Sequence, residues 1–199
     1  MIKRIPELLI YLRLLIAIFF LLARAFPNAI NIPIILTLLY LGILSDVFDG
    51  IIARKVNIAT EKLRVIDTIV DLLFYASIFY YTYLNNQQTF QSNLALIICI
   101  LILELGMYFT SIMRFRKLPS PHAILSKFWG LYLVVELTLL LLKIPGMHFY
   151  IALWIGLIVH LDRFLIYSLI TQWEHDIPSS YHALLLRKGY NIKRFSLFN

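Results

Sequence analysis

The sequence predicts an all-α membrane protein, built as a bundle of six transmembrane helices. Of its 199 residues, 61% are hydrophobic and only 15% are charged, and the mean hydropathy is +0.82. This balance lies outside the range of soluble domains. The apolar residues gather into six runs, each close to the roughly 20 residues that cross a bilayer core. Lys and Arg concentrate in alternate connections, which is the pattern of a multi-pass protein.

The six predicted spans are residues 5–25, 30–53, 63–84, 92–113, 122–142 and 148–172. The first run is too long for a signal peptide and is followed by further apolar runs, so we interpret it as a retained span. Residues 1–173 then form one transmembrane domain, and residues 174–199 form a basic cytoplasmic tail.

The basic residues mark one side of the membrane. They flank the chain start, the second and fourth connections and the tail: Lys3, Arg4, Arg54, Lys55, Lys62, Arg64, Arg114, Arg116, Lys117, Lys127, Arg187, Lys188, Lys193 and Arg194. The other connections, 26–31, 85–93 and 143–148, hold one Lys between them. By the positive-inside rule, both termini are cytoplasmic. The net charge of +7 is therefore explained by topology, and we expect no nucleic-acid partner.

Two further features of the sequence are its mixed tail and its single cysteine. Residues 181–195 mix leucines with basic residues, which suits either a short helix on an anionic membrane surface or a tail that only sets topology. Cys99 is the single cysteine, so no internal disulfide and no cysteine metal cluster can form.

Four aspartates stand where a membrane protein normally excludes charge. A carboxylate at the centre of a span costs about 2.5–3.5 kcal/mol on insertion scales. Asp46 and Asp49 lie at the cytoplasmic end of the second span, and Asp67 and Asp71 at the start of the third. At 100° per residue, the first pair is about 60° apart and the second about 40° apart. Each pair therefore shares one helix face.

The short connection between these spans makes them antiparallel neighbours, so the two acidic faces can converge. Four carboxylates without nearby His or Cys suit Mg²⁺ or Mn²⁺, and a two-metal site would leave positions open for phosphate oxygens. Such a site supports phosphoryl transfer. The alternative is that each carboxylate is neutralised by a basic group, for which Arg13, Arg54 and Arg64 are available. Glu104 and Glu136 are expected to be paired with basic groups or water in the bundle, and His160, Asp162 and Arg163 form a cluster in the sixth span that we interpret as structural or as part of a subunit interface.

The motif around these aspartates resembles the signature of the CDP-alcohol phosphatidyltransferases. That signature reads D-x-x-D-G-x-x-A-R, eight residues, G, three residues, D, three residues, D. The matching positions are Asp46, Asp49, Gly50, Ala53, Arg54, Asp67 and Asp71, with Leu63 in place of the second glycine. Leu72 also departs from the family, where many members have Lys. The six-span layout resembles the family as well.

The resemblance implies a role for each matching position. Asp46, Asp49, Asp67 and Asp71 would hold two metal ions, and Asp71 would also be the general base. Gly50 and Ala53 would let the cytidine lie against the helix, although small residues also serve close helix packing. Arg54 would lie near the donor phosphates or brace Asp49, and Thr60 would lie near the nucleotide.

The resemblance further implies an integral membrane enzyme of phospholipid synthesis with its active site at the cytoplasmic face, working as a homodimer. Residues 1–173 would be its catalytic domain. The donor would be CDP-linked, most commonly CDP-diacylglycerol, and the acceptor an alcohol. Arg114 and Lys127 are candidate contacts for a phosphorylated acceptor such as inositol phosphate or glycerol phosphate, or are topogenic charges at the lipid headgroups.

Two other classes use acidic residues in membranes. Intramembrane prenyltransferases bind a diphosphate with Asp-rich faces, but these recur on two hairpins. A divalent-cation transporter needs polar residues along a path through the bilayer. The single acidic pattern of this chain favours the phosphotransferase.

Overall fold

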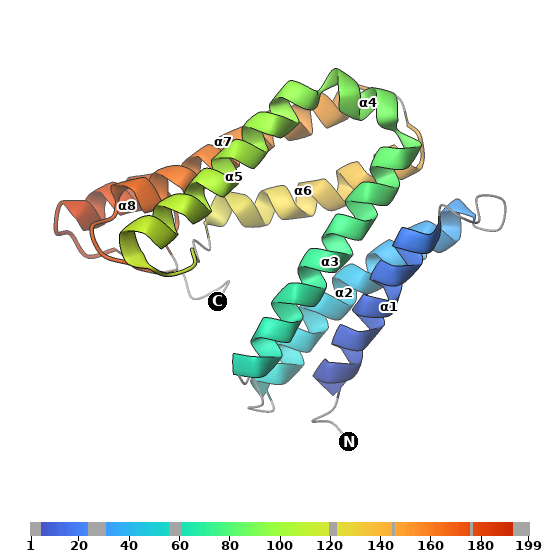
Figure 1. The fold of residues 1–199 in the computed structure, drawn as a ribbon, viewed down its shortest axis with the longest axis horizontal. Helices are drawn as coiled ribbons and strands as arrows, with labels where there is room; N and C mark the ends of the chain where they lie inside the picture. Colours follow the sequence, from blue (N-terminus) through green and yellow to red (C-terminus); the bar gives the residue numbers. More distant parts are fainter. Residues whose placement is uncertain are drawn as a thin grey trace. The chain divides into compact units, whose positions relative to one another are not determined.

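The computed structural model describes residues 5–23, 31–55, 61–119, 123–144, 146–175 and 177–192. Within these ranges, the side chains of residues 50, 53–55, 61, 62, 64, 65, 68 and 127 are not described. The described part of the chain is helical, with no β-strand (Figure 1). Its helices are α1 (Ile5–Ala23), α2 (Ile32–Lys55), α3 (Glu61–Asn85), α4 (Gln87–Ser92), α5 (Leu94–Phe115), α6 (Ile124–Leu141), α7 (His148–Leu169) and α8 (Ser180–Arg187). The all-α prediction is therefore confirmed.

Five of these helices are long and apolar enough to cross a membrane: α1, α2 over Ile32–Asp49, α5, α6 and α7. Helix α3 has 25 residues, which is sufficient length, but it carries two aspartates and several tyrosines that lower its hydropathy. The count of six spans thus stays a prediction.

Two short helices flank the long ones. Helix α4 lies in the predicted third connection, residues 85–93. Helix α8 begins close to residue 181, as predicted for the interfacial helix, but it ends at Arg187. Residues 193–199 lie outside the described part of the chain.

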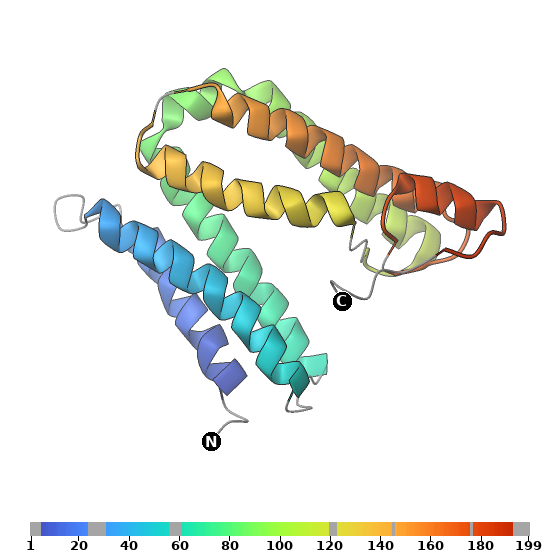
Figure 2. The same ribbon diagram turned by 180° about the vertical axis from the view of Figure 1, so that it is seen from behind.

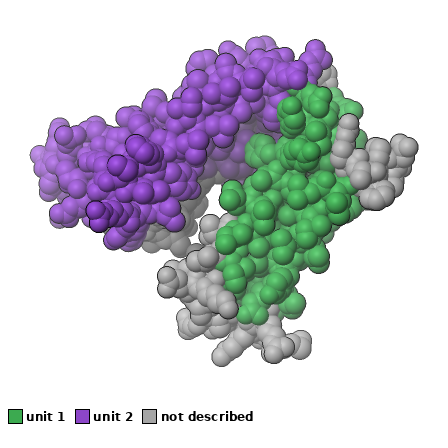
Figure 3. Space-filling view, viewed as in Figure 1, with its two compact units in different colours: residues 1–87, 140–144 green, residues 88–139, 145–199 purple. Residues whose placement is uncertain are grey.

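The chain divides into two compact units by its internal contacts (Figure 3). The first unit comprises residues 1–87 and 140–144, and the second comprises residues 88–139 and 145–199.

In the first unit, α1 packs along both α2 and α3, whereas α2 and α3 approach each other at few points. The three helices lie side by side in both views (Figures 1 and 2). Aromatic side chains fill the space between them: the Phe20 ring centroid lies 6.5 Å from that of Phe74 and 5.7 Å from that of Tyr81. Phe74 in turn lies against Gly42, where a side chain would overlap its ring. This packing sets the register of α2 against α3.

In the second unit, α5 packs against α7, and α8 packs against the end of α7. Met107, Ile166, Tyr167, Ile170, Ile177 and Ala183 form its buried apolar cluster. The core is therefore built from α5, α7 and α8 together with residues outside the helices: Ile170 and Ile177 lie between α7 and α8, and Ala123, which precedes α6, is also part of the cluster.

Several charged groups of the second unit have polar partners, and Glu104 and Glu136 are paired with basic side chains, as predicted. Glu104 lies 2.9 Å from His160 Nδ1 and 2.9 Å from Arg163. Glu136 lies 2.7 Å from His148 Nδ1. The Asp162 carboxylate accepts a hydrogen bond from the Ser180 backbone N–H at the start of α8, at 2.8 Å. These contacts give each of the three carboxylates at least one polar partner, which lowers the cost of placing it in a membrane.

Candidate functional site

The four predicted aspartates come from two helices of the first unit. Asp46 and Asp49 lie on α2, and Asp67 and Asp71 lie on α3. Carboxylate oxygens of Asp46, Asp49 and Asp67 all lie within 4.8 Å of one another. The predicted convergence of the two acidic faces is therefore confirmed for these three, and a shared ion-pair partner joins Asp71 to them.

That partner is Arg13 of α1, whose side chain is 0% exposed. Its Nη1 lies 3.2 Å from Oδ1 of Asp46 and 3.2 Å from Oδ1 of Asp67. Nη1 also pairs with Asp71, and Nη2 pairs with Asp49. One guanidinium thus contacts all four carboxylates, which is possible because α1 lies against both α2 and α3.

Ser45 holds the same guanidinium from the other edge. Arg13 Nε donates to Ser45 Oγ at 3.3 Å, and the Ser45 hydroxyl donates to the Gly42 carbonyl at 2.7 Å. All three guanidinium nitrogens are therefore engaged, and the planar group has one orientation in the cluster.

The cluster is enclosed on one side and open on the other. The Asp49 side chain is 4% exposed, whereas those of Asp46, Asp67 and Asp71 are 32%, 31% and 26% exposed. A ligand can therefore reach three of the carboxylates directly.

Arg13 does not balance the charge of this cluster. The guanidinium brings a single positive charge to four carboxylates, and carboxylate charge without a counter-cation is costly in an apolar environment. Among the described side chains, Arg13 is shared by all four aspartates, and the alternative of one basic group for each aspartate depends also on Arg54 and Arg64. Arg54 and Arg64 have side chains outside the described part of the structure.

The donor set fits divalent cations such as Mg²⁺ or Mn²⁺. It consists of carboxylate oxygens alone, which are hard ligands, and three of them are already close enough to share an ion. The excess negative charge and the open side fit a cation that also binds phosphate oxygens.

The central role of Arg13 was missed by sequence reasoning. Arg13 was recognised only as one of three possible partners for the aspartates. A signal was present, because Arg13 is an arginine in the middle of an otherwise apolar span. A buried arginine in a membrane requires a partner, and Asp46, Asp49, Asp67 and Asp71 are the group of acidic residues that the sequence places together in the neighbouring spans.

The side chains of the predicted donor-binding residues lie outside the described part of the structure. Gly50, Ala53 and Arg54 belong to the last turns of α2, but nothing beyond the backbone is described there. Thr60 lies outside the described residues altogether.

The two candidate acceptor contacts belong to other helices. Lys127 lies in the first turn of α6, and its side chain is not described. Arg114 ends α5 in the second unit and donates to the carbonyls of Tyr167, Ser168 and Ile170 at 2.7, 2.7 and 2.8 Å. These carbonyls close helix α7, where backbone acceptors lack intrahelical donors. The observed contact of Arg114 is therefore a helix cap.

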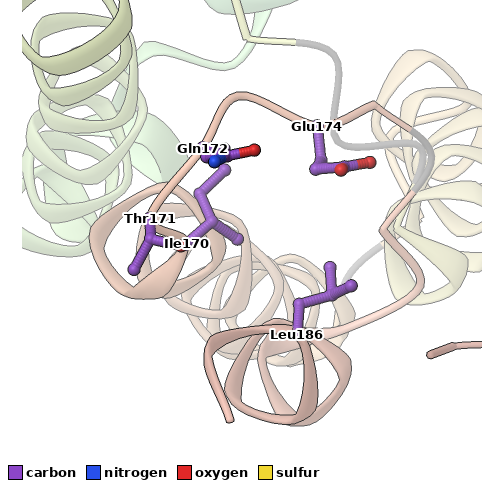
Figure 4. Close-up of a pocket in the computed structure, with 5 residues that line it drawn as sticks. All are labelled: Ile170, Thr171, Gln172, Glu174 and Leu186. Carbon is purple, nitrogen blue, oxygen red and sulfur yellow. The ribbon is translucent and has the colours of Figure 1, made fainter. Parts of the chain in front are cut away.

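A hollow of about 250 Å³ lies in the second unit (Figure 4). Ile170, Thr171, Gln172 and Glu174 line it from the segment after α7, and Leu186 lines it from α8. It contains none of the predicted site residues, so the aspartate cluster remains the candidate reaction centre.

Comparisons with curated proteins and with solved structures found no match for the chain. A family model does match it. The model of the CDP-alcohol phosphatidyltransferases covers residues 3–166, a segment that includes Arg13 and all four aspartates. The match extends over well more than half of the chain, so its support does not rest on the aspartate motif alone. The chain therefore belongs to the CDP-alcohol phosphatidyltransferase family.

Proposed function

We propose that this protein transfers a phosphatidyl group from CDP-diacylglycerol to the hydroxyl of an alcohol, with release of CMP, in phospholipid synthesis. Membership of the family supports phosphoalcohol transfer from a CDP-alcohol. The observation that carries the proposal is the convergence of the signature aspartates of α2 and α3 on one point. The alternatives left open by the acidic pattern, a prenyltransferase or a cation transporter, are not the family that matches.

The four aspartates would hold Mg²⁺ or Mn²⁺, which neutralises the donor diphosphate as the bond to CMP breaks. Asp71 accepts the proton of the acceptor hydroxyl while the hydroxyl oxygen of the acceptor attacks the phosphorus of the transferred group. The bond from that phosphorus to the CMP oxygen breaks, and CMP leaves with the electron pair. Gly50 and Ala53 give the cytidine room against α2. Arg54 contacts the donor phosphates, and Thr60 lies near the nucleotide.

The acceptor in this proposal is polar and phosphorylated, such as an inositol phosphate or glycerol phosphate. Arg114 and Lys127 bind its phosphate. A guanidinium has five N–H donors, and the bonds of Arg114 to the α7 carbonyls use three of them. The cap thus leaves capacity for a phosphate oxygen.

The proposed membrane arrangement has six spans, with α3 as the third, and both termini in the cytoplasm. Residues 1–173 form the catalytic domain and residues 174–199 the basic tail. The active site faces the cytoplasm, and the enzyme works as a homodimer surrounded by membrane lipids.

The decisive experiment follows CMP release from CDP-diacylglycerol by the purified protein across a panel of phosphorylated and unphosphorylated alcohols. We expect CMP release with Mg²⁺ or Mn²⁺, loss of activity in EDTA, and recovery when the metal is restored. Undiminished CMP release by thoroughly chelated protein would refute the metal-dependent mechanism.

The substitution Asp71→Asn distinguishes the role of Asp71 as general base from its role in binding the metal and the donor. This variant should fold, extract and bind the CDP donor, but its transfer rate should fall by at least about 10²-fold, the usual lower scale of general base catalysis. Donor binding is measured by equilibrium dialysis of labelled donor, and folding by thermal unfolding. Full activity of the variant would remove Asp71 from the mechanism. A variant that folds but no longer binds the donor would show that Asp71 is a metal ligand and not the base.

A further inference from the structure

Arg13 engages the oxygens that a metal ion would need. Its Nη1 faces Oδ1 of Asp46, Oδ1 of Asp67 and Oδ1 of Asp71, and its Nη2 faces Oδ2 of Asp49. Among the side chains that the structure describes, Arg13 is the residue that has an ion pair with each of the four aspartates. The Arg13 guanidinium and a divalent ion would therefore bind the same carboxylate oxygens.

We propose that Arg13 is a built-in counter-cation that holds the carboxylates of α2 and α3 together when divalent ions are absent, and that it competes with those ions. It is a positioning residue, and this proposal rests on the metal-dependent function proposed above. Its purpose follows from the charge: four carboxylates without any cation would force α2 and α3 apart. Its cost is weaker metal binding, because a positive charge stands among the ligands.

The contacts show how Arg13 can yield the carboxylates without leaving the site. Nε is bonded to Ser45 Oγ, which is itself tied to the backbone of α2. When ions take up the carboxylate oxygens, the Nη groups lose their partners and the Nε–Ser45 contact remains as the anchor.

The test measures Mn²⁺ binding to the purified protein by the electron paramagnetic resonance signal of free Mn²⁺. Removing a positive charge this close to the ligands should favour a divalent ion strongly, even in a screened environment. For Arg13→Gln we expect a Kd for Mn²⁺ about tenfold lower than that of the wild type. Arg13→Lys keeps the charge but loses the planar fork, so its Kd should fall by only about threefold.

Arg163→Gln is the matched control. Arg163 is also an arginine in an ion pair, but its side chain is 18% exposed and its partner is Glu104 in the second unit. The same substitution there should leave the Kd for Mn²⁺ unchanged.

A second readout is the midpoint temperature of unfolding with EDTA and with Mn²⁺. In EDTA, Arg13→Gln should unfold at a lower temperature than wild type, because its carboxylates repel one another. Mn²⁺ should raise the midpoint of Arg13→Gln more than that of wild type. If this variant cannot be purified in EDTA, it is purified in Mn²⁺ and Arg13→Lys carries the comparison.

The outcomes are distinct. Mn²⁺ binding by Arg13 variants that is equal to or weaker than that of wild type overturns the proposal, because Arg13 is then a fixed brace. Wild-type protein that binds no Mn²⁺ overturns the metal-dependent function itself, and the proposal with it. A fall in Kd for both Arg13 variants, with none for Arg163→Gln, supports it.

Discussion

At the scale of single residues, the aspartate cluster and Arg114 show two uses of arginine in this membrane protein. Arg13 is fully buried and contacts four carboxylates. Arg114 donates to carbonyls at the end of α7 and stacks 5.0 Å from the Phe115 ring centroid. In both cases the planar fork reaches several acceptors at once, which an ammonium group could not do as well.

The acceptor proposal is tested at Arg114 and Lys127. We expect Arg114→Ala and Lys127→Ala to raise the acceptor KM about tenfold for a phosphorylated alcohol and to leave it unchanged for an unphosphorylated one, because only the former loses a charged contact. Arg114→Ala should also lower thermal stability, since bonds from a charged group are worth about 1.5–3 kcal/mol.

Lys117→Ala is the control. Lys117 is a basic residue just after the end of α5, and its Nζ lies 4.7 Å from the centroid of the Trp173 ring. It should not change the preference among acceptors. Equal KM values for both alcohols in the wild type, or an unchanged preference in both variants, would mean that these residues do not bind the acceptor.

At the scale of helices, α1 is the element on which the site depends. It packs against both α2 and α3, so the two acidic faces meet through it. The aromatic contacts of Phe20 and Phe74 hold this arrangement one to two turns from the aspartates. Phe74 follows Asp71 by three residues and therefore shares its helix face.

Gly42 provides a test of this packing. A methyl group there would overlap the ring of Phe74, which is fully buried. We expect Gly42→Ala to lower the free energy of unfolding by about 1–3 kcal/mol through overpacking, despite the helix propensity that alanine adds. Because Phe74 and Asp71 share a face, the variant should also bind Mn²⁺ more weakly.

Gly130→Ala is the matched control, since it lies inside α6 with nothing within 4 Å of the added methyl. Its stability should stay the same or rise slightly. Thermal unfolding of both variants, followed by tryptophan fluorescence, makes the comparison. A Gly42→Ala protein as stable as Gly130→Ala would show that α2 and α3 tolerate a wider spacing.

At the scale of the whole molecule, the proposed topology of six spans with cytoplasmic termini would place the fourth connection in the cytoplasm and the fifth on the opposite side. Single cysteines at Leu118 and Met147, both exposed, report on these connections in a Cys99→Ser background. A membrane-impermeant maleimide applied from the cytoplasmic side should label Leu118→Cys and spare Met147→Cys. Labelling of both from one side would contradict six spans with cytoplasmic termini.

The sequence by itself determined the helical class, the long helices and the faces that carry the aspartates. These are local properties: an apolar run of sufficient length, and pairs of aspartates three or four residues apart, have the same meaning in any context. Helices α1, α2, α5 and α7 accordingly begin or end within a few residues of the predicted limits.

Only the tertiary structure decided which cation meets the aspartates and what Arg114 contacts. Arg13, Arg54 and Arg64 were equivalent candidates in the sequence, because charge alone does not say which of them reaches a distant cluster. The packing of α1 against both α2 and α3 brought Arg13 to all four carboxylates across 32 residues or more of chain. Likewise, the packing of α5 on α7 brought Arg114 to carbonyls more than 50 residues away. Such contacts depend on how helices are placed in space, which local spacing does not specify.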